Sequence, residues 1–256
     1  MKSRKKLRFM LLGFLALPLS LLTHFSVCAE ELEIAFSYDI PPFVMNSGTD
    51  GLELEIVRKA LSYRGHSFRV QQYSYKQLEG AVARLGLDAA AGVRETDDGT
   101  YYSDNFIGFE NYAITKKGSG IVLKGIEDLK GKNIITWQNA HRDLGRDFAS
   151  LFSPDVKAPY MEKYHELPVQ RDQVSLFWRK DKTVLIIDKS IFIWFTKQLS
   201  GQIDVTDEVV YHEIFPIPTE FQVNFKSRKI RDDFNEGLTH IRRTGVCEQI
   251  FDKYLK

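Results

Sequence analysis

The chain has 256 residues, of which 43% are hydrophobic and 27% are charged, a composition typical of a globular protein with a sizeable core and not of a disordered or fibrous chain. Lys and Arg number 35 against 34 Asp and Glu, which gives a formal net charge of +1. A chain without excess charge lacks the field that gathers phosphate backbones or anionic lipid, so nucleic acid is not an expected partner.

The first residues predict an export signal. A basic segment, 1–8, precedes an apolar segment, 9–22, and small residues around Ala29 form a cleavage site. The apolar segment contains Pro18 and is shorter than the ~20 residues of a membrane-spanning helix, so we expect cleavage after Ala29 and not an anchor. The alternative is a lipoprotein acylated at Cys28, which fits less well because the residue immediately before that cysteine is Val27 and not Gly or Ala. We therefore expect a periplasmic protein.

Cleavage after Ala29 leaves Cys247 as the remaining cysteine of the mature chain. A lone cysteine in an oxidising compartment forms no internal disulfide. The stability of the mature protein is therefore expected to come from its hydrophobic core.

The first block of the mature chain alternates strands and helices. The turn formers Asp39, Pro41 and Pro42 end the first strand, and Gly65 ends the first helix. The expected elements are a strand at 31–36, a helix at 52–61, a strand at 68–73, a helix at 75–85 and a strand at 87–93. Such alternation predicts parallel strand pairing with helices on the faces of the sheet.

A second block repeats the alternation. Its expected elements are a helical turn at 126–129, a strand at 132–137, helices at 141–152 and 170–179, a strand at 183–187 and a helix at 190–199. Strands at 111–116 and 219–225 flank this block, and two helices fill 231–256. The chain is therefore expected to cross twice between two lobes, which is a hinge architecture. The expected divisions are a signal peptide at 1–29, lobe 1 at 30–115 and 215–256, and lobe 2 at 116–214.

Several short motifs, taken in order, resemble one known family. They are Ile40–Phe43 (IPPF), Gly51–Glu55 (GLELE), Leu87–Gly92 (LDAAAG) followed by Thr96, Tyr102–Phe106 (YSDNF), Ile126–Lys132 (IEDLKGK) and Thr244–Tyr254. Their order and spacing resemble the periplasmic solute-binding proteins of polar amino-acid ABC transporters, called solute-binding family 3.

The resemblance implies an α/β fold of two doubly wound lobes joined by a double crossover hinge, the periplasmic binding protein type 2 fold. It further implies a monomer that captures a small polar, amino-acid-like solute between the lobes and delivers it to an inner-membrane ABC permease, without a cofactor or a metal. Open parallel sheets bind ligands outside the carboxyl ends of their strands, so the cleft is also the physically expected location. A ligand-presenting partner of a membrane sensor is an alternative that the sequence does not separate from transport.

The resemblance places Asp188, at the end of an apolar strand, where the family binds the ligand ammonium. The alternative for Asp188 is a cap on the helix that begins near Ser190. The family's carboxylate-binding Arg is replaced by Gly99, and Arg94, two residues before Thr96, is the proposed substitute. The alternative for Arg94 is a surface residue that pairs with a neighbouring carboxylate.

The other predicted ligand-binding residues belong to both lobes. In lobe 2, Trp137, Asn139 and His141 follow a strand at the position of the family's anion-binding turn, with a packed Trp and a solvated His as the alternative. In lobe 1, the predicted residues are Tyr38, Phe43, Gly92 and Thr96. Tyr38 or Phe43 is expected to compensate for Ile40, which stands where relatives stack an aromatic ring, and Glu53 is expected to stabilise a helix N-terminus.

An enzyme on the same fold, such as a dehydratase, is the main competing interpretation. The conceivable acid–base groups are Glu110, His165, Asp188, His212 and Glu213, and no spacing places two of them together. No HExxH, CxxC, GxSxG or Gly-rich phosphate loop occurs. The sequence therefore favours a binding protein over an enzyme.

Overall fold

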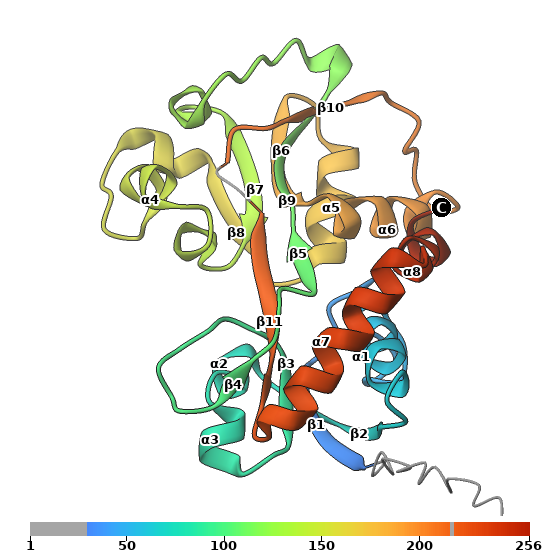
Figure 1. Cartoon of the computed structure of the whole chain (residues 1–256). Coiled ribbons are helices and arrows are strands. Elements are labelled where there is room, and N and C mark those ends of the chain that lie inside the picture. The colour runs from blue at the N-terminus through green and yellow to red at the C-terminus, as the bar shows by residue number, and fades with distance from the viewer. Residues whose placement is uncertain (1–29, 216–217) are drawn as a thin grey trace, which may run out of the picture.

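The computed structural model describes residues 30–215 and 218–256 as two lobes, one above the other in Figure 1. The predicted export signal, 1–29, and Cys28 lie outside the described residues. Within the described ranges, no helix is both long enough and apolar enough to cross a membrane.

Lobe 1 is built on a sheet in which the strands of the first predicted block pair in parallel. Its strands are β1 (Glu31–Ser37), β2 (Ser67–Tyr73), β3 (Ala89–Val93), β4 (Tyr101–Tyr102), β5 (Ile107–Phe109) and β11 (Thr219–Phe225). The order is β2-β1-β3-β11-β4, with β5 also paired to β11. β1 pairs in parallel with β2 and β3, whereas β11 runs antiparallel to β3, β4 and β5.

The helices of lobe 1 cover both faces of this sheet. They are α1 (Leu52–Ser62), α2 (Tyr75–Leu78), α3 (Ala81–Leu85), α7 (Arg228–Arg243) and α8 (Val246–Leu255). α1 and α7 bury their apolar faces with β1 residues such as Ile34, while α2 and α3 pack on the other face with Ala35 and Ala90. The single helix predicted at 75–85 is wrong, because Gly80 takes a left-handed conformation (φ 74°) that divides it.

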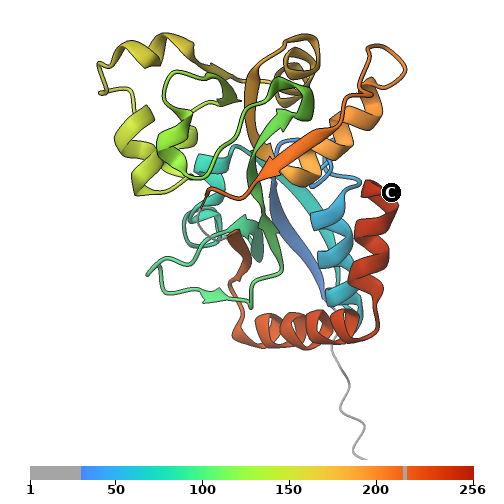
Figure 2. The ribbon, with the colours of Figure 1, turned by 90° about the horizontal axis from the view of Figure 1, so that it is seen from above.

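α1 and α7 approach each other closely at one glycine. A Cβ added to Gly237 would stand 2.0 Å from the carbonyl oxygen of Ala60, closer than any real side chain allows. Figures 1 and 2 show the two helices side by side on the same face of lobe 1. The small residue therefore permits the helix crossing that brings the C-terminal segment back to lobe 1.

Lobe 2 is a second sheet with the order β10-β6-β9-β7-β8. Its strands are β6 (Asn111–Lys116), β7 (Asn133–Trp137), β8 (Tyr164–Leu167), β9 (Thr183–Asp188) and β10 (Val209–His212). β7 pairs in parallel with β8 and β9, and β6 runs antiparallel to β9 and β10. The predicted strands at 111–116, 132–137 and 183–187 are confirmed, whereas β4, β5, β8 and β10 are too short to show an alternating pattern.

Three α-helices cover the faces of the lobe 2 sheet: α4 (Arg146–Phe152), α5 (Gln170–Arg179) and α6 (Lys189–Leu199). Short 3-10 turns complete the lobe: η1 (Lys117–Ser119), η2 (Ile126–Leu129), η3 (Ala140–Arg142) and η4 (Pro159–Lys163). α4 packs on one face and α5 and α6 on the other, as the two separate clusters of buried side chains show. The helix predicted to begin at His141 is wrong in its start, since α4 begins only at Arg146.

The chain crosses between the lobes twice. β5 belongs to lobe 1 and β6 to lobe 2, so the first crossing lies at Glu110, and the expected boundary at 115/116 falls at the end of β6. The second crossing lies between β10 and β11, and β11 runs down the middle of Figure 1 from one lobe into the other. One cluster of buried side chains continues from β1 and α1 into β9 and α6. The two lobes therefore share a core beside the hinge.

Candidate functional site: the interlobe cleft

Each lobe has a topological switch point at the carboxyl ends of its parallel strands. In lobe 1, α1 leaves β1 on one face while the connection into β3 runs over the other face. In lobe 2, α4 follows β7 on one face and α6 follows β9 on the opposite face. Ligands of open α/β sheets bind in the crevice at such points. The candidate site therefore comprises the loops after β1 and β3 in lobe 1 and after β7 and β9 in lobe 2.

A cluster of polar side chains connects the two lobes at these loops. Arg94, directly after β3, donates from Nη2 to Oδ1 of Asp143 at 3.1 Å. Trp137, at the end of β7, donates from Nε1 to the other oxygen, Oδ2, at 3.3 Å. The Arg94 guanidinium also lies 5.5 Å from the centroid of the Phe221 ring in β11. Two predicted site residues, Arg94 and Trp137, are thus brought together through a carboxylate that the sequence analysis did not select.

The loop after Arg94 is closed by a local hydrogen-bond network. Thr96 Oγ1 lies 2.9 Å from Tyr102 Oη, which donates to Asp98 Oδ2 at 2.9 Å. Burial raises the pKa of Asp98, but hydrogen bonds from Thr100 and Tyr102 outweigh it and hold the pKa below its ordinary value. Thr96 and Asp98 therefore belong to one network that holds the loop after Arg94.

The loop after β7 has a different shape from the expected helix start. Asn139 has a left-handed backbone (φ 61°), and its N–H donates to Glu166 Oε2 at 3.1 Å. His141 lies in η3 with Nδ1 buried and without a hydrogen-bond partner among the described residues. The helix that would present amide groups to an anion begins five residues later than predicted, after Gly145.

Asp188 lies at the end of β9 and caps α6. Its Oδ1 accepts the N–H of Ile191 at 3.0 Å, and its Oδ2 accepts the N–H of Glu110 at 2.8 Å. Burial raises the pKa of Asp188 to about 7, although these two backbone donors favour the charged form. The contacts of Asp188 in this structure are therefore those of a helix cap, which was the alternative interpretation. The hydrogen bond from the Glu110 N–H also connects the start of α6 to the first interlobe crossing.

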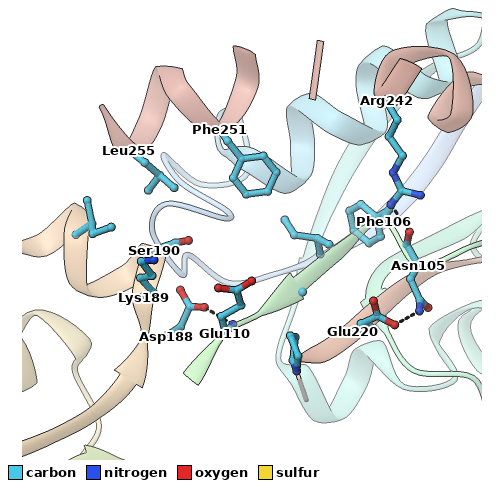
Figure 3. Close-up of a pocket in the computed structure, with 14 residues that line it drawn as sticks. Asn105, Phe106, Glu110, Asp188, Lys189, Ser190, Glu220, Arg242, Phe251 and Leu255 are labelled. Carbon is cyan, nitrogen blue, oxygen red and sulfur yellow. Dashed lines mark hydrogen bonds between the residues drawn. The ribbon is translucent and has the colours of Figure 1, made fainter. Parts of the chain in front are cut away.

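A pocket of about 460 Å³ lies beside Asp188 at the hinge, and we call it the hinge pocket. Its lining comes from the hinge strands, the start of α6 and the C-terminal helices: Asn105, Phe106, Ile107, Gly108, Glu110, Asp188, Lys189, Ser190, Ile193, Pro218, Glu220, Arg242, Phe251 and Leu255. Figure 3 shows Glu110 and Asp188 on one side, Arg242 and Asn105 on the other, and Phe251 between them. Both lobes contribute to the hinge pocket, so its shape depends on the angle between them.

The predicted aromatic wall of lobe 1 divides into one exposed and one buried residue. Tyr38 is 59% exposed, whereas Phe43 is fully buried against Phe109, with ring centroids 4.2 Å apart. Phe109 in turn contacts Phe221 at 5.4 Å, the ring under Arg94. Phe43 is therefore a core residue packed on Phe109, and of the two predicted residues only Tyr38 faces solvent.

Gly92 and Glu53 approach each other closely at the lobe 1 switch point. Gly92 has a left-handed backbone (φ 72°), and a Cβ there would stand 3.2 Å from Glu53 Oε2. Glu53 is 3% exposed, its Oε2 has no hydrogen-bond partner among the described residues, and burial raises its pKa to about 7. Glu53 lies in the first turn of α1, whose N-terminus has no side-chain cap, so its expected stabilisation of that helix end stays a prediction.

Sequence reasoning missed Asp143 and Phe221. Asp143 lies in an irregular segment between η3 and α4, and Phe221 has the appearance of an ordinary strand residue. The only signal for Asp143 was its place in an Asp-Leu-Gly turn directly before a helix. No group of three or more His, Cys, Asp or Glu side chains suited to a metal ion occurs within 30–215 and 218–256.

Comparisons with known proteins bear on the fold. No protein-family model and no curated protein matches the sequence. The ligand-binding core of GluR0, solved with L-glutamate, is 16% identical, with a TM-score of 0.66 over 90% of this chain and 100% of that chain. The arginine-, lysine-, histidine-binding protein ArtJ from Geobacillus stearothermophilus is 16% identical, with a TM-score of 0.61 over 88% and 94% of the two chains.

A histidine kinase sensor domain with similarity to periplasmic binding proteins is also 16% identical, with a TM-score of 0.60 over 88% of this chain and 96% of that chain. The chain therefore has the two-lobed fold of periplasmic binding proteins of type 2. The resemblance to the amino-acid-binding proteins of solute-binding family 3 is confirmed at the level of the fold.

Proposed function

We propose that this protein is an extracytoplasmic solute-binding protein that captures a small polar, amino-acid-like solute in the interlobe cleft and delivers it to an ABC permease. The observation that carries the proposal is the meeting of Arg94, Asp143 and Trp137 across two facing switch points. A solute held there contacts both lobes at once, so its binding is linked to the angle between them.

The proposed solute has an anionic group at Arg94, because a guanidinium binds carboxylate with two parallel hydrogen bonds. Trp137, Asn139 and His141 form the proposed facing wall in lobe 2, while Tyr38, Gly92 and Thr96 complete lobe 1. Asp188 is the proposed partner of a cationic group. A carboxylate has about four acceptor positions, so Asp188 is able to accept a further donor beside the backbone N–H groups of Ile191, Glu110 and Ser190.

A binding role is favoured over catalysis. The GluR0 ligand-binding core and ArtJ are binding proteins, which supports a binding role. Two of the acid–base candidates, Glu110 and Asp188, lie together in the hinge pocket, but the Asp188 carboxylate accepts the backbone N–H groups of Glu110 and Ile191 and caps α6. The proposed location is the periplasm, after removal of the predicted signal. Incubation of the protein with each solute that it binds, followed by mass spectrometry, tests this part, because any turnover contradicts a pure binding protein.

Solute binding is tested by thermal shift over amino acids, opines and other small zwitterions, followed by calorimetric titration of each hit. A ligand that binds only the folded state stabilises it by about 2.7 kcal/mol at a hundredfold excess over Kd. Arg94→Ala and Asp188→Asn are each expected to weaken a zwitterionic hit by roughly 1.5–3 kcal/mol, the range for hydrogen bonds to charged groups. Asp155→Asn, an exposed residue beyond α4, is the matched control. Unchanged affinity in both cleft variants would remove these residues from the site.

A sensor partner is the second candidate, favoured by the likeness to a histidine kinase sensor domain. Transport and sensing use the same closed form, so the binding protein alone does not separate them. Crosslinking of the solute-loaded protein to inner-membrane proteins, followed by their identification, separates a permease from a sensor kinase.

A further inference from the structure

The Asp143 carboxylate of lobe 2 forms an ion pair with the Arg94 guanidinium of lobe 1. One of its oxygens accepts from Arg94 at 3.1 Å, and the other accepts from Trp137 at 3.3 Å. The contact with Arg94 therefore uses a single carboxylate oxygen, whereas the planar guanidinium is able to bind both oxygens of one carboxylate.

The pair is accessible to solvent. The side chains of Arg94 and Asp143 are 45% and 37% exposed, so a solute reaches both without unfolding of the surrounding structure. Exposed ion pairs contribute at most a modest free energy, and salt screens them. The Phe221 ring, 5.5 Å from the guanidinium, belongs to lobe 1 and keeps Arg94 in position when the partner changes.

We propose that Asp143 is a specificity-determining residue of the cleft, because it occupies the anion position on Arg94 until the anionic group of a solute replaces it. This inference rests on the proposed function and names the group against which every solute competes. A tethered carboxylate acts at a high effective concentration, so weakly bound anions fail to displace it.

The same residue selects for a second charge on the solute. Asp143 stays near the site after displacement, since Trp137 still donates to its other oxygen. A bound carboxylate then lies close to a second carboxylate, and two like charges at short range repel. A solute that carries a cationic group beside its carboxylate reduces this repulsion, so the cleft favours zwitterions over simple anions.

The Arg94–Asp143 contact is tested first without any solute. The chain has 3 Trp residues, so full-length mature protein labelled with 5-fluorotryptophan gives a resolvable fluorine NMR spectrum, and Trp137→Phe assigns the Trp137 signal. Arg94→Gln is expected to move the Trp137 resonance, because loss of the guanidinium frees Asp143 to shift against Trp137. Asp143→Asn is expected to move it further, and Asp155→Asn is the control that leaves it at the wild-type position.

Two results would contradict the proposed connection of Arg94 to Trp137 through Asp143. One is a Trp137 resonance that Arg94→Gln leaves unchanged, since the arginine then has no connection to the tryptophan through Asp143. The other is an Arg94→Gln effect that persists in full when Asp143 is already Asn. A double variant that equals Asp143→Asn alone supports the inference, because both changes then act on the same contact.

Specificity is tested with L-glutamate and glutarate, which share two carboxylates and differ in the ammonium group. Glutarate is expected to move the Trp137 resonance at roughly 1.5-fold to fivefold lower concentration in Asp143→Asn than in wild type, the range set by loss of an exposed ion pair. L-Glutamate is expected to gain less from the same substitution. Equal glutarate titrations in the two proteins, or no response to glutarate in either, overturn the specificity role.

The experiments separate this inference from the proposed function. If the thermal-shift screen finds no solute while Arg94→Gln moves the Trp137 signal, the proposed function fails and the Arg94–Asp143 contact stands. If a solute binds with wild-type affinity and selectivity in Asp143→Asn, the function stands and the role of Asp143 falls.

Discussion

Replacement of Glu53 by Gln is expected to change the pH dependence of stability. Glu53 is 3% exposed and has one oxygen without a hydrogen-bond partner among the described residues, so its ionisation in the folded state is costly. Burial raises its pKa to about 7, whereas the unfolded value is about 4.3. The folded state therefore binds a proton that the unfolded state has already lost, and wild-type stability falls as pH rises toward and through 7.

The size of the effect follows from the pKa difference. Each unit of difference between the folded and unfolded pKa corresponds to about 1.36 kcal/mol. Between pH 5 and the folded pKa of about 7, a span of about two pH units, the folded state holds a proton that the unfolded state has lost. Glu53→Gln resembles the protonated acid at every pH, so its free energy of unfolding relative to wild type is expected to rise by about 2–3 kcal/mol across this interval. Asp188 titrates in both proteins and cancels in the difference.

Urea unfolding followed by circular dichroism at pH 5, 6, 7 and 8.5 measures this difference directly. Glu248→Gln, an exposed change on α8, is the control and is expected to differ from wild type by a constant amount at all four pH values. A Glu53→Gln difference that is equally flat would refute the reasoning, because it would mean that Glu53 ionises freely in the folded protein.

Three further predictions follow from single features. Gly237→Ala is expected to lower the free energy of unfolding by about 1–3 kcal/mol, because its Cβ would overlap the Ala60 carbonyl; an alanine placed without loss of thermal stability would contradict the close helix crossing. Asp188→Ala is expected to cost about 2–4 kcal/mol in urea unfolding, since it removes a helix cap and leaves the Glu110 N–H without its acceptor, whereas Asp155→Ala should cost under about 0.5 kcal/mol. N-terminal sequencing of the exported protein is expected to begin at Glu30, and a start at acylated Cys28 would establish a lipoprotein instead.

Much of the fold was predictable because it depends on patterns within short segments. The strand at 31–36 and the helix at 52–61 show their periods directly, and the order of strands and helices implies parallel sheets with right-handed connections. The flanking strands at 111–116 and 219–225 were sufficient to predict two crossings between lobes. The sequence by itself therefore determined the class of fold and predicted the edge of each sheet for a ligand site.

The short elements were not predictable, since a strand of two to four residues shows too few alternations. β4, β5, β8 and β10 are of this kind, and each is held by pairing with a longer strand that is distant in the chain. The start of α4 was misplaced for a related reason. η3 satisfies local hydrogen bonds from Ala140 onward, and the sequence pattern does not distinguish this turn from the first turn of a helix.

Only the tertiary structure decided which side chains meet in the cleft. The place of Asp188 at a strand end was predictable, but the Glu110 N–H that binds its second oxygen comes from a segment 78 residues away. Arg94 was a reasonable candidate, yet its partner Asp143 lies 49 residues away in the other lobe. A contact between lobes depends on the angle at the hinge and on the path of two loops. Neither the hinge angle nor the path of a loop produces a periodic pattern in the sequence.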